Sequence, residues 1–254
     1  MSNATTTTTR RAAPLAVALL IVGIDMLVAR LSTIATSDAD LGARVAIDIG
    51  LYAVRAVLAL LVLARFLPGK RIDWSLLGSP ARGWRVELRW SLAVTLAGGI
   101  GVTLLIAAAG IIALSAGVPL PAPAEQDLEL LRSGAWQARL PLLIGIGVLA
   151  AIAAPVTEEL IYRGVLLPPL IARFGVLPAI AIDALVFGFL HVGPYGHGGI
   201  AALEVLGGLF MSIAFAWRGS LIAPIVVHAG GNVYLAVLAL VYVQAWERIP
   251  WAFA

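Results

Sequence analysis

Three groups of polar residues lie within apolar stretches in the second half of the chain, and their types suit hydrolytic chemistry. In each group two members are four residues apart, so they share one face of a helix. The groups are Glu158-Glu159 with Arg163, Phe187 with His191, and His228 with Asn232. Polar side chains are unfavourable in hydrocarbon and by default mark a buried functional site. A glutamate with two histidines can supply the acid–base groups of a hydrolase.

The two adjacent glutamates are predicted to have different roles. Glu159 and Arg163 are one helical turn apart, so they are expected to form a buried ion pair that neutralises both charges. Glu158 projects about 100° away around the helix and has no cation on its own helix. It is therefore the better candidate for a general base.

The two histidines and the asparagine complete the candidate site. A lone histidine in a membrane helix can simply hydrogen-bond between helices, but His191 and His228 both fall at a depth that matches a glutamate. His228 and Asn232 project from consecutive turns, so their N–H groups can form an oxyanion hole side by side. Phe187, one turn before His191, is assigned to packing.

The elements that position these residues are membrane helices. The 254 residues are 61% hydrophobic and 12% charged, with a mean hydropathy of +1.00, and such a chain has too little polar surface to cover itself in water. We expect an all-α polytopic bundle of about seven transmembrane helices, with eight as the alternative. The expected spans are residues 14–33, 45–66 and 90–117, a fourth from about 140 through the glutamate pair, and residues 176–191, 200–217 and 220–246.

The chain is predicted to form one transmembrane domain, residues 14–246, after a disordered cytoplasmic N-terminus of residues 1–13. Arginines gather at the N-terminus and in the loop over residues 65–89, which places both in the cytoplasm because basic loops stay on that side. Cysteine is absent, which excludes thiolate catalysis, cysteine-bound zinc and disulfides. The basic residues orient helices and do not argue for a nucleic-acid partner.

The depth of the site requires a long fourth helix. His191 lies fifteen residues into its span, about 22 Å deep at ~1.5 Å per residue, so Glu158 reaches it only if its helix continues to about Arg173. Pro168 and Pro169 are expected to break or kink that continuation.

Other embedded charges are expected to find partners. Asp25 and Arg55 both lie near the middle of their spans, where they can pair with each other. Asp183, two turns before His191, could orient that histidine, and plain packing is an equal alternative. Glu204 lies toward the outer face and receives no role.

The order Glu-Glu-x-x-x-Arg, Phe-x-x-x-His and His-x-x-x-Asn resembles the signature of the CPBP family, the type II CAAX prenyl endopeptidases and bacteriocin-processing proteins also called Abi proteins. The resemblance covers residues 140–241 and includes the Trp217–Leu221 turn. Each motif alone is weak, and three in order on apolar helices are specific. The resemblance implies a helical membrane bundle with a cavity open to the cytoplasm and the bilayer.

By the same resemblance, each motif residue receives an expected role. Glu158 and His191 would activate water, His228 and Asn232 would hold the oxyanion, and a supporting group of Glu159, Arg163 and Phe187 would surround them. Glu158, His191 and His228 could also ligate zinc, but the chain lacks a His-Glu-x-x-His motif. We expect catalysis that requires no cofactor, with zinc as the alternative.

The leading hypothesis is an intramembrane endopeptidase that acts on a membrane-associated CAAX-like or bacteriocin-like peptide in a bacterial cytoplasmic membrane. The alternative is a non-proteolytic membrane scaffold or a bacteriocin self-immunity factor. A transporter is a third class, but its paired repeats with broken helices are not found here. Prenylated substrates are not carried over from eukaryotic relatives, because bacteria generally lack prenylated CAAX proteins.

Overall fold

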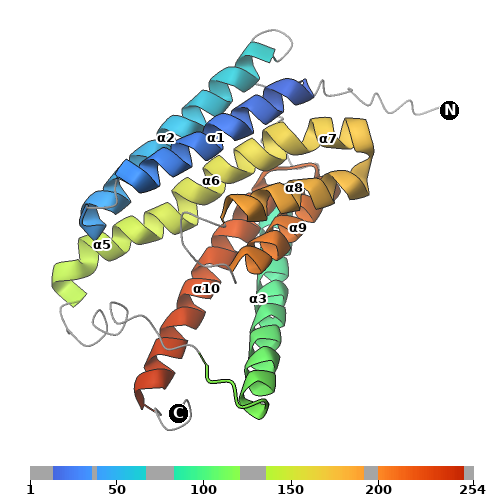
Figure 1. Cartoon of the computed structure of the whole chain (residues 1–254). Coiled ribbons are helices and arrows are strands. Elements are labelled where there is room, and N and C mark those ends of the chain that lie inside the picture. The colour runs from blue at the N-terminus through green and yellow to red at the C-terminus, as the bar shows by residue number, and fades with distance from the viewer. Residues whose placement is uncertain (1–13, 36–38, 67–82, 121–135, 192–199, 249–254) are drawn as a thin grey trace.

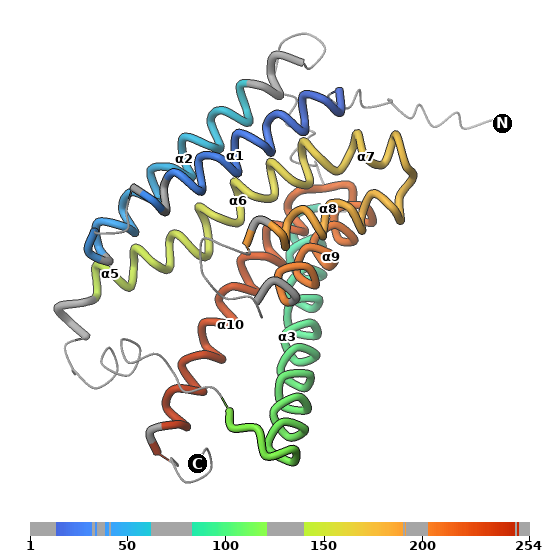
Figure 2. The backbone as a smooth tube through the Cα atoms, in the orientation of Figure 1, coloured from blue at the N-terminus to red at the C-terminus, as the bar shows by residue number. Residues whose placement is uncertain are grey.

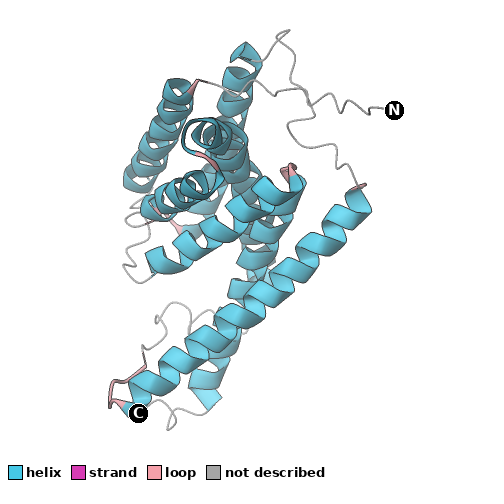
Figure 3. Cartoon of the chain, turned by 90° about the vertical axis from the view of Figure 1, so that its right-hand side faces the viewer, coloured by secondary structure: helices cyan, strands magenta, loops and turns pink. Residues whose placement is uncertain are grey.

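The structure is a computed structural model, and it describes residues 14–35, 39–66, 83–120, 136–191 and 200–248. Within these ranges every regular element is a helix, and no strand is drawn in Figure 3. The predicted all-α class is therefore confirmed for the described part of the chain. The predicted disorder of residues 1–13 lies outside it.

A hairpin of α1 (Leu15–Ala35) and α2 (Leu41–Phe66) lies along one side of a long helical rod (Figure 1). On the other side, α3 (Trp84–Ser115) packs along α10 (Ile222–Arg248), and α8 (Val176–Leu190) packs along α9 (Ile200–Arg218). The hydrophobic core forms where the rod meets α1, α8, α9 and α10, around buried Tyr162, Phe187 and Leu221.

The rod runs without interruption from Trp136 to Phe174 and contains the first motif (Figure 2). It consists of α5 (Trp136–Val148), a π turn η3 (Leu149–Ala153), α6 (Ala154–Glu159), a second π turn η4 (Leu160–Leu166) and α7 (Leu167–Phe174). The long fourth helix required by the depth argument is thus present. Pro168 and Pro169 do not end the rod, because they directly follow the second π turn. In that turn the Leu167 N–H donates a hydrogen bond to the carbonyl of Tyr162, five residues earlier in the chain.

Glycines with positive φ make the tight connections between helices. Gly175, with φ +82°, joins α7 to α8, and Gly219, with φ +63°, ends α9. Such φ values are costly for residues with a Cβ. After Gly219, the Ser220 hydroxyl accepts a hydrogen bond from the Ile222 N–H and caps α10.

Among the described residues, three helices are long and apolar enough to cross a membrane: Trp84–Ser115, Leu140–Phe174 and Ile222–Trp246. A fourth apolar helix, Val176–Phe189, is shorter. Many large apolar side chains lie exposed on the helices, such as Leu177 at 79% and Phe189 at 72%, as expected for contact with lipid. A multi-pass membrane protein is supported, and the count of seven or eight spans stays a prediction.

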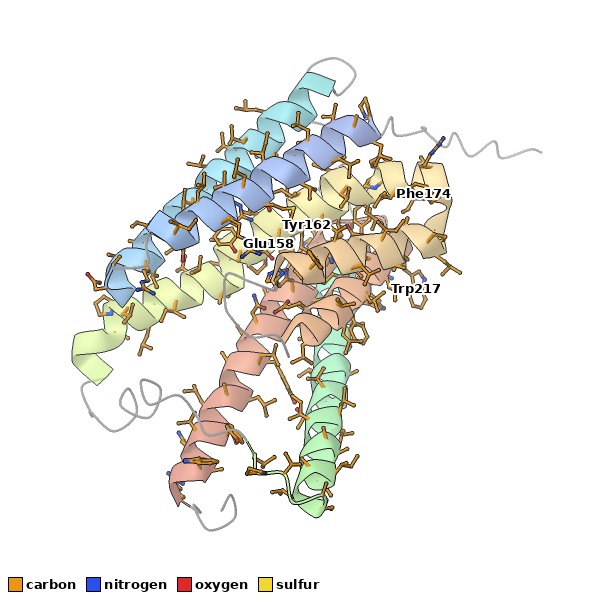
Figure 4. The ribbon with its side chains drawn as sticks, viewed as in Figure 1. Glu158, Tyr162, Phe174 and Trp217 are labelled. Atoms are coloured by element: carbon orange, nitrogen blue, oxygen red, sulfur yellow. The ribbon has the colours of Figure 1, made fainter. Side chains whose placement is uncertain are left out.

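The start of α3 and the end of α9 lie on the same face of the bundle. The Arg218 guanidinium donates to both Glu87 carboxylate oxygens, at 2.5 and 2.9 Å, and lies over the Trp90 ring. Figure 4 shows Trp217 and Phe174 near this same end. The basic loops predicted these two helix ends to share a side of the membrane, and which side is cytoplasmic stays a prediction.

Candidate active site

Glu158 lies at the centre of the bundle, where three other helices bring polar groups to its carboxylate (Figure 4). The Tyr52 hydroxyl on α2 donates to Oε1 at 2.8 Å. The other oxygen, Oε2, lies 3.9 Å from His191 Nε2 and 3.8 Å from His228 Nε2. The side chain is almost fully buried. The structure thus brings together the glutamate and both histidines that the sequence predicted to converge.

His191 is held in one ring orientation by its own helix. It caps the C-terminus of α8, and its Nδ1 lies 2.8 Å from the Phe187 carbonyl oxygen. Because a carbonyl only accepts, Nδ1 must carry the proton, and in the neutral ring Nε2 is left with a lone pair that faces Glu158. The Phe187 ring is fully buried and packs against His191, His228 and Tyr162, so it fixes their positions by contact.

His228 is oriented by Glu159. Its Nδ1 lies 2.8 Å from Glu159 Oε1, which also accepts a hydrogen bond from Arg163 at 3.0 Å. The expected ion pair between Glu159 and Arg163 is therefore present, and Glu159 has a second contact that sequence spacing did not indicate. A carboxylate on Nδ1 allows the ring to carry a second proton on Nε2, which would make His228 a donor toward the site.

Arg163 is fully buried and is surrounded by polar and aromatic groups. Besides Glu159, it donates to the Gly208 carbonyl at 3.0 Å, its Nε lies 3.3 Å from Asp183 Oδ2, and its guanidinium lies 4.7 Å from the Phe187 ring centre. The prediction that Asp183 could orient His191 is wrong. Eight residues turn an α-helix by about 80° beyond two full turns, so Asp183 faces Arg163 and accepts from Ser212 instead.

Asn232 donates its side-chain amide to the Ala150 carbonyl oxygen at 2.8 Å. The π turn explains why that carbonyl is available. The Ala154 N–H, its partner in an α-helix, donates to Leu149 instead, and the next residue, Pro155, has no N–H. Asn232 therefore donates to a carbonyl that has no backbone partner within the rod, and this hydrogen bond links α10 to the rod. The amide has a second N–H, which leaves it able to serve a substrate as well.

The first helices contribute a polar network that supports Glu158. The predicted pair of Asp25 and Arg55 is present, with distances of 2.5 and 2.9 Å, and Tyr162 donates to the same aspartate at 3.0 Å. The Arg55 guanidinium lies over the Tyr52 ring, 4.4 Å from its centre. Thr157 also donates to the Tyr52 carbonyl, at 3.1 Å. Sequence reasoning missed Tyr52, whose one signal was its place one turn before an embedded arginine.

Two imidazoles around one buried carboxylate oxygen can hold and deprotonate a water molecule. Both Nε2 atoms lie within 4 Å of Oε2, so one water can contact all three groups at hydrogen-bond distance. Within the described ranges, no group of three or more histidine, aspartate or glutamate residues is arranged to hold a metal ion. The fold and the site together define a helical membrane protein with a glutamate–histidine centre of the hydrolytic type.

Comparison with known families agrees with this class. Residues 140–234 match the family described as type II CAAX prenyl endopeptidase Rce1-like. The matched segment, 95 of the 254 residues, contains all three motifs, and over this segment the chain is similar to that family, as the motifs indicated. The description of that family names an endopeptidase, which agrees with the acid–base groups around Glu158. No curated protein and no solved structure matches the chain.

Proposed function

We propose that the protein is an endopeptidase that hydrolyses a peptide bond in a membrane-associated peptide, with a water activated by Glu158 and His191. The observation that carries this proposal is the convergence of both Nε2 atoms on Oε2 of a buried glutamate whose other oxygen is held by Tyr52. A carboxylate fixed in this way has one oxygen free for a proton from water.

The proposed reaction has two steps. In the first, the water gives a proton to Glu158, its oxygen bonds to the peptide carbonyl carbon, and the carbonyl oxygen becomes an oxyanion. His228 Nε2–H and the second Asn232 N–H would stabilise that oxyanion. In the second, the carbon–nitrogen bond breaks as the proton on Glu158 passes to the leaving amine. The products are a new carboxyl terminus and a new amino terminus.

The broad test is proteolysis of a membrane-derived peptide library by purified protein, with Glu158→Ala as its comparison. Wild type is expected to cleave a subset of peptides that the variant leaves intact. Cleavage by both proteins would point to a contaminant. Cleavage by neither would favour the alternative of a non-proteolytic scaffold or immunity factor.

Tyr52→Phe is expected to lower kcat with little change in KM. The substitution keeps the ring over Arg55 and removes the hydroxyl that holds Glu158 Oε1. A hydrogen bond to a charged group contributes ~1.5–3 kcal/mol, so we expect a loss of about tenfold or more. Tyr242→Phe, which removes a phenol hydroxyl from the far part of α10, is the control. An unchanged kcat for Tyr52→Phe would show that the hydroxyl does not position the base.

Chelators are expected to leave activity unchanged, because the proposed base acts on water directly. His228→Ala and Asn232→Ala should each lower kcat by roughly 10²–10³-fold, as for loss of an oxyanion donor. Assays before and after treatment with chelator, with metal analysis of the same samples, check both statements. Stoichiometric zinc in active protein, with activity lost on chelation and restored by zinc, would replace this mechanism by one with Glu158, His191 and His228 as ligands.

A further inference from the structure

A cavity of about 120 Å³ opens beside the candidate site, between α3, α9 and α10. Four glycines line it, Gly98 and Gly99 on α3, Gly207 on α9 and Gly231 on α10, and a Cβ added at Gly98 or Gly231 would meet no atom within 4 Å. At Gly98 and Gly231 the cavity therefore occupies space that a side chain could fill. His228 and Asn232 also line it, so it is continuous with the proposed oxyanion site.

One carboxylate, that of Glu204, lines this otherwise mainly apolar cavity. The sequence placed Glu204 toward the outer face without a role, but the structure places it in the same cavity as His228. In the part of the chain that the structure describes, no hydrogen bond or ion pair reaches its carboxylate. A partly buried carboxylate with no partner is unfavourable in an apolar setting. In a membrane protein such a group marks a functional position by default.

We propose that this cavity is a substrate subsite that selects a lysine or arginine side chain near the scissile bond, with Glu204 as its specificity-determining residue. The proposal rests on the proposed endopeptidase function. A long basic side chain matches the cavity because its aliphatic stem contacts apolar walls while its cationic end meets a carboxylate. Charge complementarity of this kind discriminates against neutral and acidic side chains at the same position.

The test uses fluorescent apolar peptides in detergent micelles, in which one lysine is moved along the sequence and each lysine peptide has glutamine and glutamate counterparts. Binding is measured to the Glu158→Gln protein, which keeps the subsite and lacks the proposed base. The best lysine peptide should bind about tenfold more tightly than its glutamine counterpart, as for a partly desolvated charge pair. Adding Glu204→Gln should abolish that difference and leave the glutamine peptide's affinity within about twofold.

A cavity-filling variant and two controls keep the proposal falsifiable if Glu204→Gln folds poorly. Gly98→Leu should fill the cavity and weaken binding of all the peptides, while Gly101→Leu, on the same helix with no atom within 4 Å of its added Cβ and outside the cavity lining, should not. Asp40→Asn, an exposed carboxylate at the start of α2, controls for loss of negative charge.

Cleavage assays separate the subsite from the function on which it rests. If wild type cleaves peptides without any preference for lysine or arginine, or if Glu204→Gln lowers kcat/KM for all peptides equally, the subsite proposal is overturned and the endopeptidase stands. If wild type cleaves nothing, the proposed function fails, and the binding difference between lysine and glutamine peptides still decides whether Glu204 selects a cation.

Discussion

Glu158→Gln is expected to reduce peptide turnover by roughly 10²–10⁴-fold, the usual contribution of a general base. Glutamine keeps the size of the side chain, and its amide oxygen can still accept from Tyr52, which lies 2.8 Å from Oε1. The variant therefore loses the proton acceptor and retains the packing. Rates with a cleaved peptide, together with thermal unfolding of both proteins in the same detergent, measure the two properties separately.

A conservative change at an exposed carboxylate gives the matched control for this loss. Asp40→Asn keeps an oxygen that can accept from the Ala43 N–H, as Asp40 does now at 2.9 Å, and it should retain wild-type turnover. Wild-type rates for Glu158→Gln would remove Glu158 from the mechanism. Equal loss of rate and of folded protein would assign it a structural role.

Glu159→Gln is expected to destabilise the protein by ~3–5 kcal/mol, the usual effect of removing one partner from a buried ion pair. Glu159 Oε1 serves both Arg163 and His228, so the neutral side chain leaves a fully buried guanidinium with weaker compensation. We expect a lower midpoint of unfolding in denaturant or on heating, and a lower kcat because His228 loses its orienting carboxylate.

The double variant Glu159→Gln with Arg163→Met separates these two effects. Removing both charges deletes the uncompensated cation, so stability should recover in part relative to Glu159→Gln alone. Activity should not recover, because His228 still lacks its partner. If the double variant loses as much free energy of unfolding as the two single variants lose together, Glu159 and Arg163 do not act as a coupled pair.

The convergence of the site was predictable from the sequence because it depends on periodicity. Residues four apart share a helix face, which indicated the Glu159–Arg163 pair. Depth counting required a helix that continues past Glu158, and the rod to Phe174 supplies it. Asp25 and Arg55 were predictable partners because each needed an opposite charge in hydrocarbon.

The rest depends on how helices far apart in sequence are rotated and packed. Nothing in the spacing of Tyr52 indicates that its hydroxyl meets Glu158, 106 residues later. Asp183 and Glu204 were placed by distance along the chain alone, and helix rotation turned the first toward Arg163 and the second into the cavity. The hydrogen bond from Asn232 to the Ala150 carbonyl could not be predicted, because it depends on a π turn that the sequence pattern does not indicate.

The two π turns also change how the rod can be compared with its relatives residue by residue. A π turn spans five residues where an α turn spans four, so each can absorb one added residue while the α-helical segments on both sides keep their contacts. Losing one residue from Leu149–Ala153 would turn the π turn into an α turn and keep both segments in place. Losing one residue from the α-helical part of α6 would instead rotate the preceding residues by about 100° relative to Glu158. Sequences that differ by a single gap at Leu149–Ala153 can therefore share the same site, and positions should be counted outward from the glutamate in each segment separately.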